Sequence, residues 1–284
     1  MMTRTLAAMQ FLLIVGCFLA ASSASADDYT WNFRNGHFDN LSLVPIGPGA
    51  VNLLRPTNDG LRISVPAGHD VKSVGFSPRF KVRGDFEMTV EFTILNRTQP
   101  QSGSGTGPNI YLSMGSTKDP AAALGRQLRP DGRDIYGVFA ARVDAGQRIP
   151  KAKLFDVPNP AATTSGSLRL QRIKQQITYA VSDKSQPMFR SLATLDVSDA
   201  DVTMLRVGLS QSDPQSAAEI LIHNIHVTAT ALPELPSAES RTAQLYRPRY
   251  QPPPTPKSYR WLWQSVAGLI VLGACAAWLW RRRR

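Results

Sequence analysis

Residues 84–94 carry the clearest alternation of apolar and polar positions in the chain. The apolar members are every second residue, namely Phe86, Met88, Val90, Phe92 and Ile94. Successive side chains of a β-strand point to opposite faces, so this segment would have one apolar and one polar face as a strand. A helix, with its period of about 3.6 residues, would spread the same residues around its circumference. The pattern therefore predicts a β-strand whose apolar face packs against a second layer.

Short segments of the same kind continue through residues 27–232 and are separated by turn residues such as Asn58-Asp59-Gly60. Residues 44–48 hold two prolines and are predicted to form a loop or an edge strand, while residues 121–128 are the one stretch compatible with a helix. Many short strands with almost no helix predict an all-β fold, a β-sandwich spanning residues 27–232. The other predicted strands are at residues 29–40, 61–65, 109–114, 135–143, 151–155, 167–172, 176–181, 188–195, 204–210 and 219–230.

Three of these segments resemble a known superfamily. They are the Gly-Asp-Phe start of the strand at residues 84–86, the Leu-Arg-Leu-Gln-Arg run at 168–172 and the closing Ile-His-Asn-Ile-His-Val at 222–227. Together they resemble the concanavalin A-like lectin/glucanase jelly rolls over roughly residues 31–229. Within that superfamily the chain looks closest to secreted bacterial domains of unknown function. The resemblance implies a jelly-roll-like β-sandwich and carbohydrate as the class of ligand.

Residues 1–26 have the pattern of a secretory signal peptide. Arg4 gives the positive start, residues 6–21 form the apolar stretch, and Ala24-Ser25-Ala26 is a small-residue cleavage site. An alternative is a bacterial lipoprotein signal, because Ile14-Val15-Gly16-Cys17 resembles a lipobox. The apolar run continues past Cys17 to the Ala-x-Ala site, which favours the cleaved signal peptide.

The C-terminal residues predict a membrane anchor. Residues 233–260 contain seven prolines and are expected to form an extended spacer. Residues 261–280 carry no charge and have tryptophans at both ends, which predicts a transmembrane helix. Arg281–Arg284 should stay cytoplasmic by the positive-inside rule, which makes this a single-pass cell-membrane protein with an extracytoplasmic domain. An alternative is that the spacer, the helix and the arginine cluster together form a sorting signal that is removed from the mature protein.

The net charge of +11 belongs mainly to this C-terminal part. Residues 27–232 hold 22 Lys and Arg against 19 Asp and Glu, a net of +3, whereas residues 233–284 hold 9 against 2, a net of +7. A nucleic-acid-binding module needs a basic patch on the folded domain, so no nucleic-acid partner is predicted. The two cysteines, Cys17 and Cys275, both lie outside the domain, which excludes a disulfide or a thiolate metal site within it.

The resemblance raises the question of glucanase chemistry. Catalytic members of the superfamily that cleave β-glucans resemble one another in a Glu-x-Asp-x-x-Glu strand, which places the nucleophile and the acid/base on one face. Glu87 and Glu91 are nearest to this pattern, but Thr89 replaces the aspartate and the second glutamate comes one residue early. Their Cα atoms would lie roughly 13 Å apart on a strand, whereas hydrolysis needs about 5–9.5 Å between carboxyl groups. We therefore predict that the domain is not an enzyme and has no catalytic residue.

Two groups of residues could hold a metal ion. His223 and His226 are three positions apart, which on a regular strand places them on opposite faces. Asp196, Asp199 and Asp201 offer oxygen ligands for Ca²⁺ but lack the dense spacing and the glycine of a calcium loop. Neither a metal site nor another cofactor is predicted.

The polar face of the central sheet is the predicted binding surface. The candidate ligand-binding residues are Glu87, Glu91, Arg142, Arg169 and Gln171. Sugar sites often include an aromatic platform, for which three tyrosines are available, Tyr111, Tyr136 and Tyr179. The predicted function is a non-catalytic, membrane-tethered extracytoplasmic module that binds a glycan or a cell-envelope partner. One alternative is a glycoside hydrolase-like enzyme with an unrecognised active site, and another is that these residues only face solvent.

Overall fold

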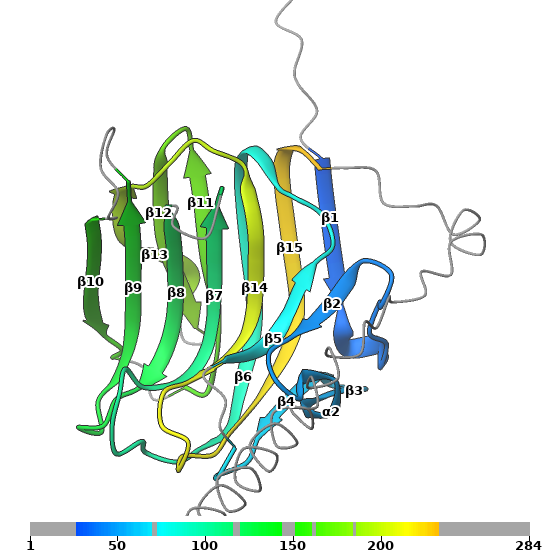
Figure 1. Cartoon of the computed structure of the whole chain (residues 1–284), viewed down its shortest axis with the longest axis vertical. Helices are drawn as coiled ribbons and strands as arrows, with labels where there is room; N and C mark the ends of the chain where they lie inside the picture. The colour runs from blue at the N-terminus through cyan, green and yellow to red at the C-terminus, as the bar shows by residue number, and fades with distance from the viewer. Residues whose placement is uncertain are drawn as a thin grey trace, which may run out of the picture. The chain divides into compact units, whose positions relative to one another are not determined.

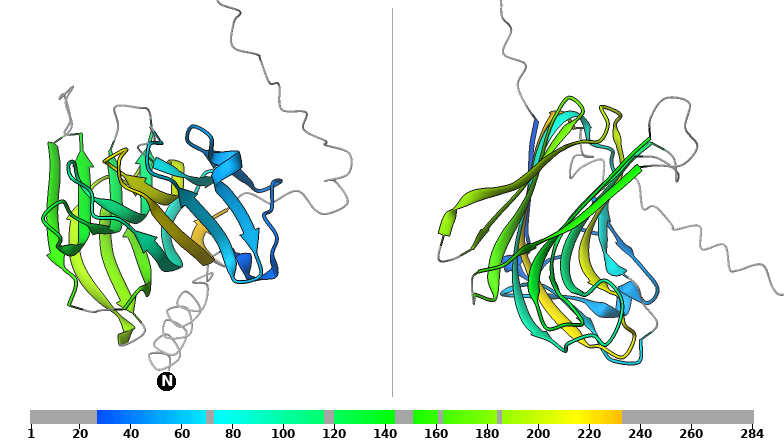
Figure 2. Two further views of the ribbon diagram at one scale, coloured as in Figure 1. Left: turned by 90° about the horizontal axis from the view of Figure 1, so that it is seen from below. Right: turned by 90° about the vertical axis from the view of Figure 1, so that its left-hand side faces the viewer.

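A computed structural model describes residues 27–69, 73–115, 120–143, 151–160, 163–183 and 186–232 of the chain. Within these residues the strands form two antiparallel sheets, of eight and seven strands (Figure 1). The two sheets pack face to face as a sandwich, which Figure 2 shows from two further sides. The remaining regular elements are the 3-10 turn η1 (Phe33–Asn35) and the one-turn helix α2 (Ala50–Leu53).

The eight-stranded sheet, which we call the β6 sheet, has the order β13-β12-β11-β6-β15-β4-β3, and β1 also pairs with β15. Its strands are β1 (Asp27–Asn32), β3 (Leu54–Thr57), β4 (Gly60–Val65), β6 (Arg83–Arg97), β11 (Ser165–Ile173), β12 (Gln176–Asp183), β13 (Gln186–Asp196) and β15 (Ala218–Ala231). The seven-stranded sheet, the β7 sheet, has the order β10-β9-β8-β7-β14-β5-β2. Its strands are β2 (Leu43–Ile46), β5 (Ser73–Pro78), β7 (Thr106–Met114), β8 (Ala121–Leu128), β9 (Asp134–Arg142), β10 (Lys151–Pro158) and β14 (Val202–Gln211).

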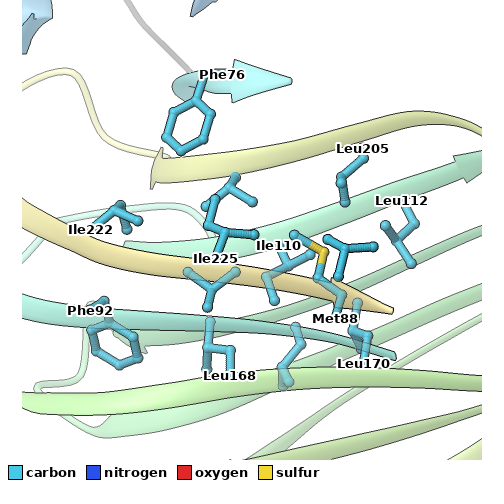
Figure 3. Packing of buried hydrophobic residues seen from close by; sticks show 14 of the residues in the cluster. Phe76, Met88, Phe92, Ile110, Leu112, Leu168, Leu170, Leu205, Ile222 and Ile225 are labelled. Atoms are coloured by element: carbon cyan, nitrogen blue, oxygen red, sulfur yellow. The ribbon is translucent and has the colours of Figure 1, made fainter. Parts of the chain in front are cut away.

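The hydrophobic core lies between the two sheets. Every second residue of β6 points into it, from Phe86 to Ile94, and none of these five side chains is more than 5% exposed. They belong to one cluster with Ile110 and Leu112 of β7 and with Leu168 of β11 (Figure 3). Full burial of an apolar side chain of this size stabilises the fold by roughly 1.5–3 kcal/mol. The apolar half of the β6 alternation therefore fixes which face of the strand is left outside.

Several sequence predictions are confirmed by this topology. The strand at residues 84–94 is β6 and lies between β11 and β15 in its sheet. Residues 167–172 and 176–181 lie in the paired strands β11 and β12, joined by a turn in which Lys174 has a φ of 55°. Residues 44–46 lie in β2, which among the described strands pairs with β5 alone. It is thus an edge strand of its sheet, the position that tolerates Pro45.

The prediction of a helix-compatible segment at residues 121–128 is wrong, because this segment is strand β8. Its alanines favour a helix, but helix propensity is weak against tertiary context. β8 pairs with β7 on one side and β9 on the other, and Ala122 and Leu124 are fully buried from its inner face. Two hydrogen-bonded neighbours and a buried inner face decide the conformation.

No helix in the described part of the chain is long and apolar enough to cross a membrane. The predicted signal peptide at 1–26, spacer at 233–260, transmembrane helix at 261–280 and arginine cluster at 281–284 all lie outside the described residues.

Candidate functional site

A groove of about 510 Å³ lies on the outer face of the β6 sheet, and we call it the β6 groove. Strands β13, β12, β11, β6 and β15 all contribute to its lining, and η1 adds Arg34. Its polar lining residues are Arg34, Thr89, Glu91, Thr93, Ser165, Ser167, Ser182, Asp183 and His223. Phe189 of β13 adds an aromatic ring.

Strand register explains why these side chains meet. Glu91 of β6 is paired with Ser167 of β11 on one side and with Asn224 of β15 on the other. Thr93 is paired with Ser165 in the same way. Because paired residues project from the same face of a sheet, the polar half of the β6 alternation meets the polar residues of its neighbours.

Hydrogen bonds hold the groove side chains in place. Thr93 Oγ1 lies 2.7 Å from Ser165 Oγ and 2.8 Å from His223 Nε2. The other ring nitrogen of His223, Nδ1, lies 2.7 Å from the carbonyl oxygen of Asp59, so both imidazole nitrogens are engaged. Arg34 Nη2 donates to Glu91 Oε2 at 3.3 Å. The groove therefore presents an ordered set of donors and acceptors.

A second ion pair adjoins the groove. Arg169 Nη1 lies 3.6 Å from Glu87 Oε1, and the Arg169 guanidinium carbon lies 4.0 Å from the centroid of the Phe189 ring. This cation–π contact fixes the ring against β11. Glu87, Arg169 and Phe189 thus form a connected unit from three strands beside the hydrogen-bonded groove residues.

The structure brings together four of the five predicted ligand-binding residues. Glu91 lines the β6 groove, Glu87 and Arg169 form the adjoining ion pair, and Gln171 is paired with Glu87 across β11 and β6. Arg142 is placed apart from them, on β9 of the β7 sheet, where its Nη1 lies 3.9 Å from Asp196 Oδ2. Alternation alone could not assign Arg142 to a sheet, because that depends on the topology.

The aromatic ring of the site was missed by the sequence analysis. Tyr136 and Tyr179 are buried in the core, where burial raises the pKa of both phenols. Tyr111 lies on β7 of the opposite sheet. The ring of Phe189 lines the groove, as does part of Phe92, whose side chain is otherwise buried in the core. Register shifts between β12 and β13 interrupt the alternation there, so the sequence carried no clear signal for its face.

The prediction that His223 and His226 occupy opposite faces is also wrong. The pairing of β15 with β6 shifts between Ile222 and Asn224, and this irregularity inserts an extra residue on the outer side. His223 therefore enters the groove, while His226 is paired with Thr89, another groove residue. The two rings have separate partners, since His226 Nε2 lies 2.6 Å from Asp28 Oδ1.

The described residues contain no cluster of three or more histidine, cysteine, aspartate or glutamate side chains able to hold a metal ion. Among the aspartates considered for calcium, Asp196 pairs with Arg142 and Asp201 pairs with Arg83, each at 3.9 Å.

A family model described as "Protein of unknown function (DUF1583) C domain" matches residues 18–252. The chain belongs to this family. No curated protein matches the sequence significantly. The family description assigns no activity, so it agrees with the predicted resemblance to domains of unknown function and adds no ligand.

Solved structures resemble this DUF1583 chain in fold. A prokaryotic β-1,3-1,4-glucanase (lichenase) from a mouse hindgut metagenome has a TM-score of 0.50 at 9% identity, covering 72% of this chain and 99% of its own. The Crh5 transglycosylase in complex with NAG has a TM-score of 0.48 at 12% sequence identity, and the match covers 74% of this chain and 87% of the transglycosylase. A legume lectin-like domain from Entamoeba histolytica has a TM-score of 0.44 at 14% sequence identity, and the match covers 66% of this chain and 90% of the lectin-like domain. The likeness to the lichenase and the two-sheet sandwich confirm the predicted fold, a β-sandwich of the concanavalin A-like lectin/glucanase jelly-roll type.

These comparisons contradict the prediction that the domain is not an enzyme, because the lichenase is a glucanase built on this same fold. The physical argument behind that prediction was also incomplete. It compared Cα positions with a separation that applies to carboxyl groups. A glutamate carboxylate stands at the end of a flexible side chain, so two glutamates on one strand face can bring their carboxyl groups closer together than their Cα atoms.

Proposed function

We propose that the domain binds a polysaccharide in the β6 groove. The observation that carries this proposal is the combination of an ordered polar lining with the ring of Phe189. Sugar hydroxyls both donate and accept hydrogen bonds, and the C–H faces of sugar rings pack on aromatic side chains. Guanidinium, carboxylate, hydroxyl and imidazole groups offer every partner that such hydroxyls need.

The extent of the groove supports a chain-like ligand. Its lining runs from Phe189 on β13 to His223 on β15, which is four strand spacings or roughly 19 Å. A ligand that crosses the strands along this line would meet Ser182, Ser167 and Glu91 in turn. A single sugar would fill only part of it, which favours an oligosaccharide or polysaccharide.

Binding can be tested directly with the purified full-length protein. Neutral glucans, mannans, chitin and acidic polysaccharides would be offered in turn, and binding measured by depletion or by titration calorimetry. We expect saturable binding to at least one of them. A protein with the circular dichroism of a folded β-domain that binds none of these polymers would contradict the proposal.

Hydrolysis or transglycosylation is a second candidate activity, favoured by one observation. Glu87 and Glu91 lie on the same outer face of β6, and each is paired with an arginine. The assay is release of reducing ends from any polysaccharide that binds. If these two glutamates catalyse the reaction, Glu87→Gln and Glu91→Gln should each abolish the release of reducing ends. Asp131 is exposed in the β8–β9 turn, so Asp131→Asn should not affect the release. Release that persists in both glutamate variants would place the chemistry elsewhere.

We also propose that the domain is extracytoplasmic and held at a membrane by residues 261–280. The support comes from the sequence, namely the signal-peptide pattern at residues 1–26 and the uncharged segment with tryptophans at its ends. A location outside the cytoplasm would give the domain access to envelope polysaccharides.

A further inference from the structure

A second groove, of about 670 Å³, lies over the β3–β4 end of the β6 sheet. We call it the β4 groove. Its lining includes Arg55 of β3, Arg62 and Ser64 of β4, Asn96 of β6 and Glu219 of β15. Leu53, Pro56 and Val65 add apolar surface. None of its residues is among the ligand-binding residues predicted from the sequence.

Two arginines face each other in this groove. Arg55 and Arg62 are direct partners in the register of β3 with β4. The neighbouring pair, Leu54 with Ile63, is buried in the core, so the alternation places both arginines on the outer face. Like charges directly opposite each other on an antiparallel pair destabilise it. The repulsion between the two guanidinium groups destabilises this strand pair, and a bound anion would relieve it.

The protein neutralises only part of this charge. Arg62 Nη1 lies 3.4 Å from Glu219 Oε1, which also accepts a hydrogen bond from Ser64 Oγ at 2.6 Å. Among the described residues, Arg55 has no acidic partner. The buried Nε of Arg62 likewise has no hydrogen-bond partner in this part of the chain. The exposed guanidinium of Arg55 is therefore left for a ligand.

We propose that the β4 groove binds the anionic group of an acidic polysaccharide, either a carboxylate or a sulfate ester. This inference rests on the proposed function, since it names the class of glycan that the same sheet face takes. A guanidinium binds such oxyanions through paired, charge-assisted hydrogen bonds. Ser64 and Asn96 can meet neighbouring sugar hydroxyls.

The two grooves lie along one line across the sheet. In the strand register Arg55 is paired with Arg62, Arg62 with Leu221, and Leu221 with Thr93 of the β6 groove. The line from Thr93 to Arg55 covers three strand spacings, roughly 14 Å. A polysaccharide in the β6 groove that continues across β15 would therefore bring a later sugar to the two arginines.

The test compares Arg55→Gln with Arg133→Gln in the full-length protein. Arg133 is the control, because it is an exposed arginine like Arg55 but lies in the β8–β9 turn of the other sheet, away from both grooves. Polygalacturonate supplies carboxylates, dextran sulfate supplies sulfates, and unmodified dextran and laminarin are neutral probes.

We expect wild type to prefer one acidic polymer, and Arg55→Gln to weaken that binding about tenfold, the loss of one charge-assisted contact. The Arg133→Gln variant should bind like wild type. The melting temperature of Arg55→Gln should be equal to that of wild type or higher, because the substitution removes the like-charge pair.

Preference for polygalacturonate would identify the anion as a carboxylate, and preference for dextran sulfate as a sulfate. Equal binding of acidic and neutral polymers, or equal losses in the two variants, would overturn this inference and leave the proposed function intact. Absence of binding to every polysaccharide would overturn both.

Discussion

At the scale of single residues, Asp134 shows how one carboxylate joins the two sheets. Its Oδ2 lies 2.5 Å from Arg97 Nη2 of β6 and 2.7 Å from Arg126 Nη2 of β8. The Arg126 side chain is only 3% exposed. Burial alone would raise the pKa of Asp134, but the hydrogen bonds and charges of the two arginines outweigh it and hold the pKa below its ordinary value of 3.8.

We expect Asp134→Asn to lower the free energy of unfolding by about 3 kcal/mol at neutral pH, because it leaves a buried arginine without its counter-ion. A folded-state pKa below the unfolded-state value means that the stabilisation is complete above about pH 5 and is lost as the pH falls through the folded-state pKa. Denaturant unfolding of wild type and of Asp134→Asn should therefore show a difference in the free energy of unfolding that is smaller at about pH 3 than at neutral pH. A difference that stays constant with pH would contradict this assignment.

Individual residues also show how much of the candidate site could be predicted from the sequence. Alternation along β6 was enough to place Glu87 and Glu91 on the outer face, and the hairpin pattern placed Arg169 and Gln171 beside them. Phe189 and His223 were not predictable in this way, because each lies near a register shift that breaks the period of two. The β4 groove depends on which strands are neighbours, which no local pattern records.

At the scale of elements, β5 and β14 approach each other through two glycines. Gly75 and Gly208 are direct partners in the register. A Cβ atom on Gly208 would lie 2.1 Å from the carbonyl oxygen of Val74 and 2.5 Å from the Cα of Gly75. These are backbone atoms, which cannot rotate away. The pairing of the two strands therefore requires glycine at this position.

Gly208→Ala should destabilise the domain by about 2 kcal/mol or more, since the two backbones must separate to admit the methyl group. Gly137→Ala in β9 is the matched control. There the nearest atom to the new Cβ, at 3.1 Å, is Oε1 at the flexible end of the Gln127 side chain. Thermal or denaturant unfolding measures the loss of stability in each of the two variants. Equal stability losses in the two variants would show that the close approach of β5 and β14 is not the cause.

Most of the fold could be predicted at this scale. The strands with clear alternation, such as β6, β11 and β12, were found, and only their ends differ by a few residues. The alanine-rich β8 was not found as a strand, because alanine has no preference for the sheet and its conformation is imposed by β7 and β9.

At the scale of the whole molecule, the sequence divides into a nearly neutral domain and a basic C-terminal part. The net charge is +3 for residues 27–232 and +7 for residues 233–284. The division matches the proposal of an extracytoplasmic domain on a membrane anchor that ends in Arg281–Arg284.

Protease treatment tests this topology. Added to intact cells or spheroplasts, the protease should remove the β-domain and leave a small membrane-bound fragment that contains residues 261–280. A tag after Arg284 would report that fragment. A domain that stays protected until the cells are lysed would contradict the proposed orientation.

Comparison of Phe189→Ala with Met188→Ala tests the central claim, polysaccharide binding in the β6 groove, most directly. Phe189 lines the groove and packs on Arg169, whereas Met188 is the adjacent residue, is 85% exposed and is not part of the lining. Titration with the polysaccharide that wild type binds most tightly should show Phe189→Ala weakened by about tenfold or more. The Met188→Ala variant should retain wild-type affinity. Unchanged affinity in a correctly folded Phe189→Ala variant would contradict the account.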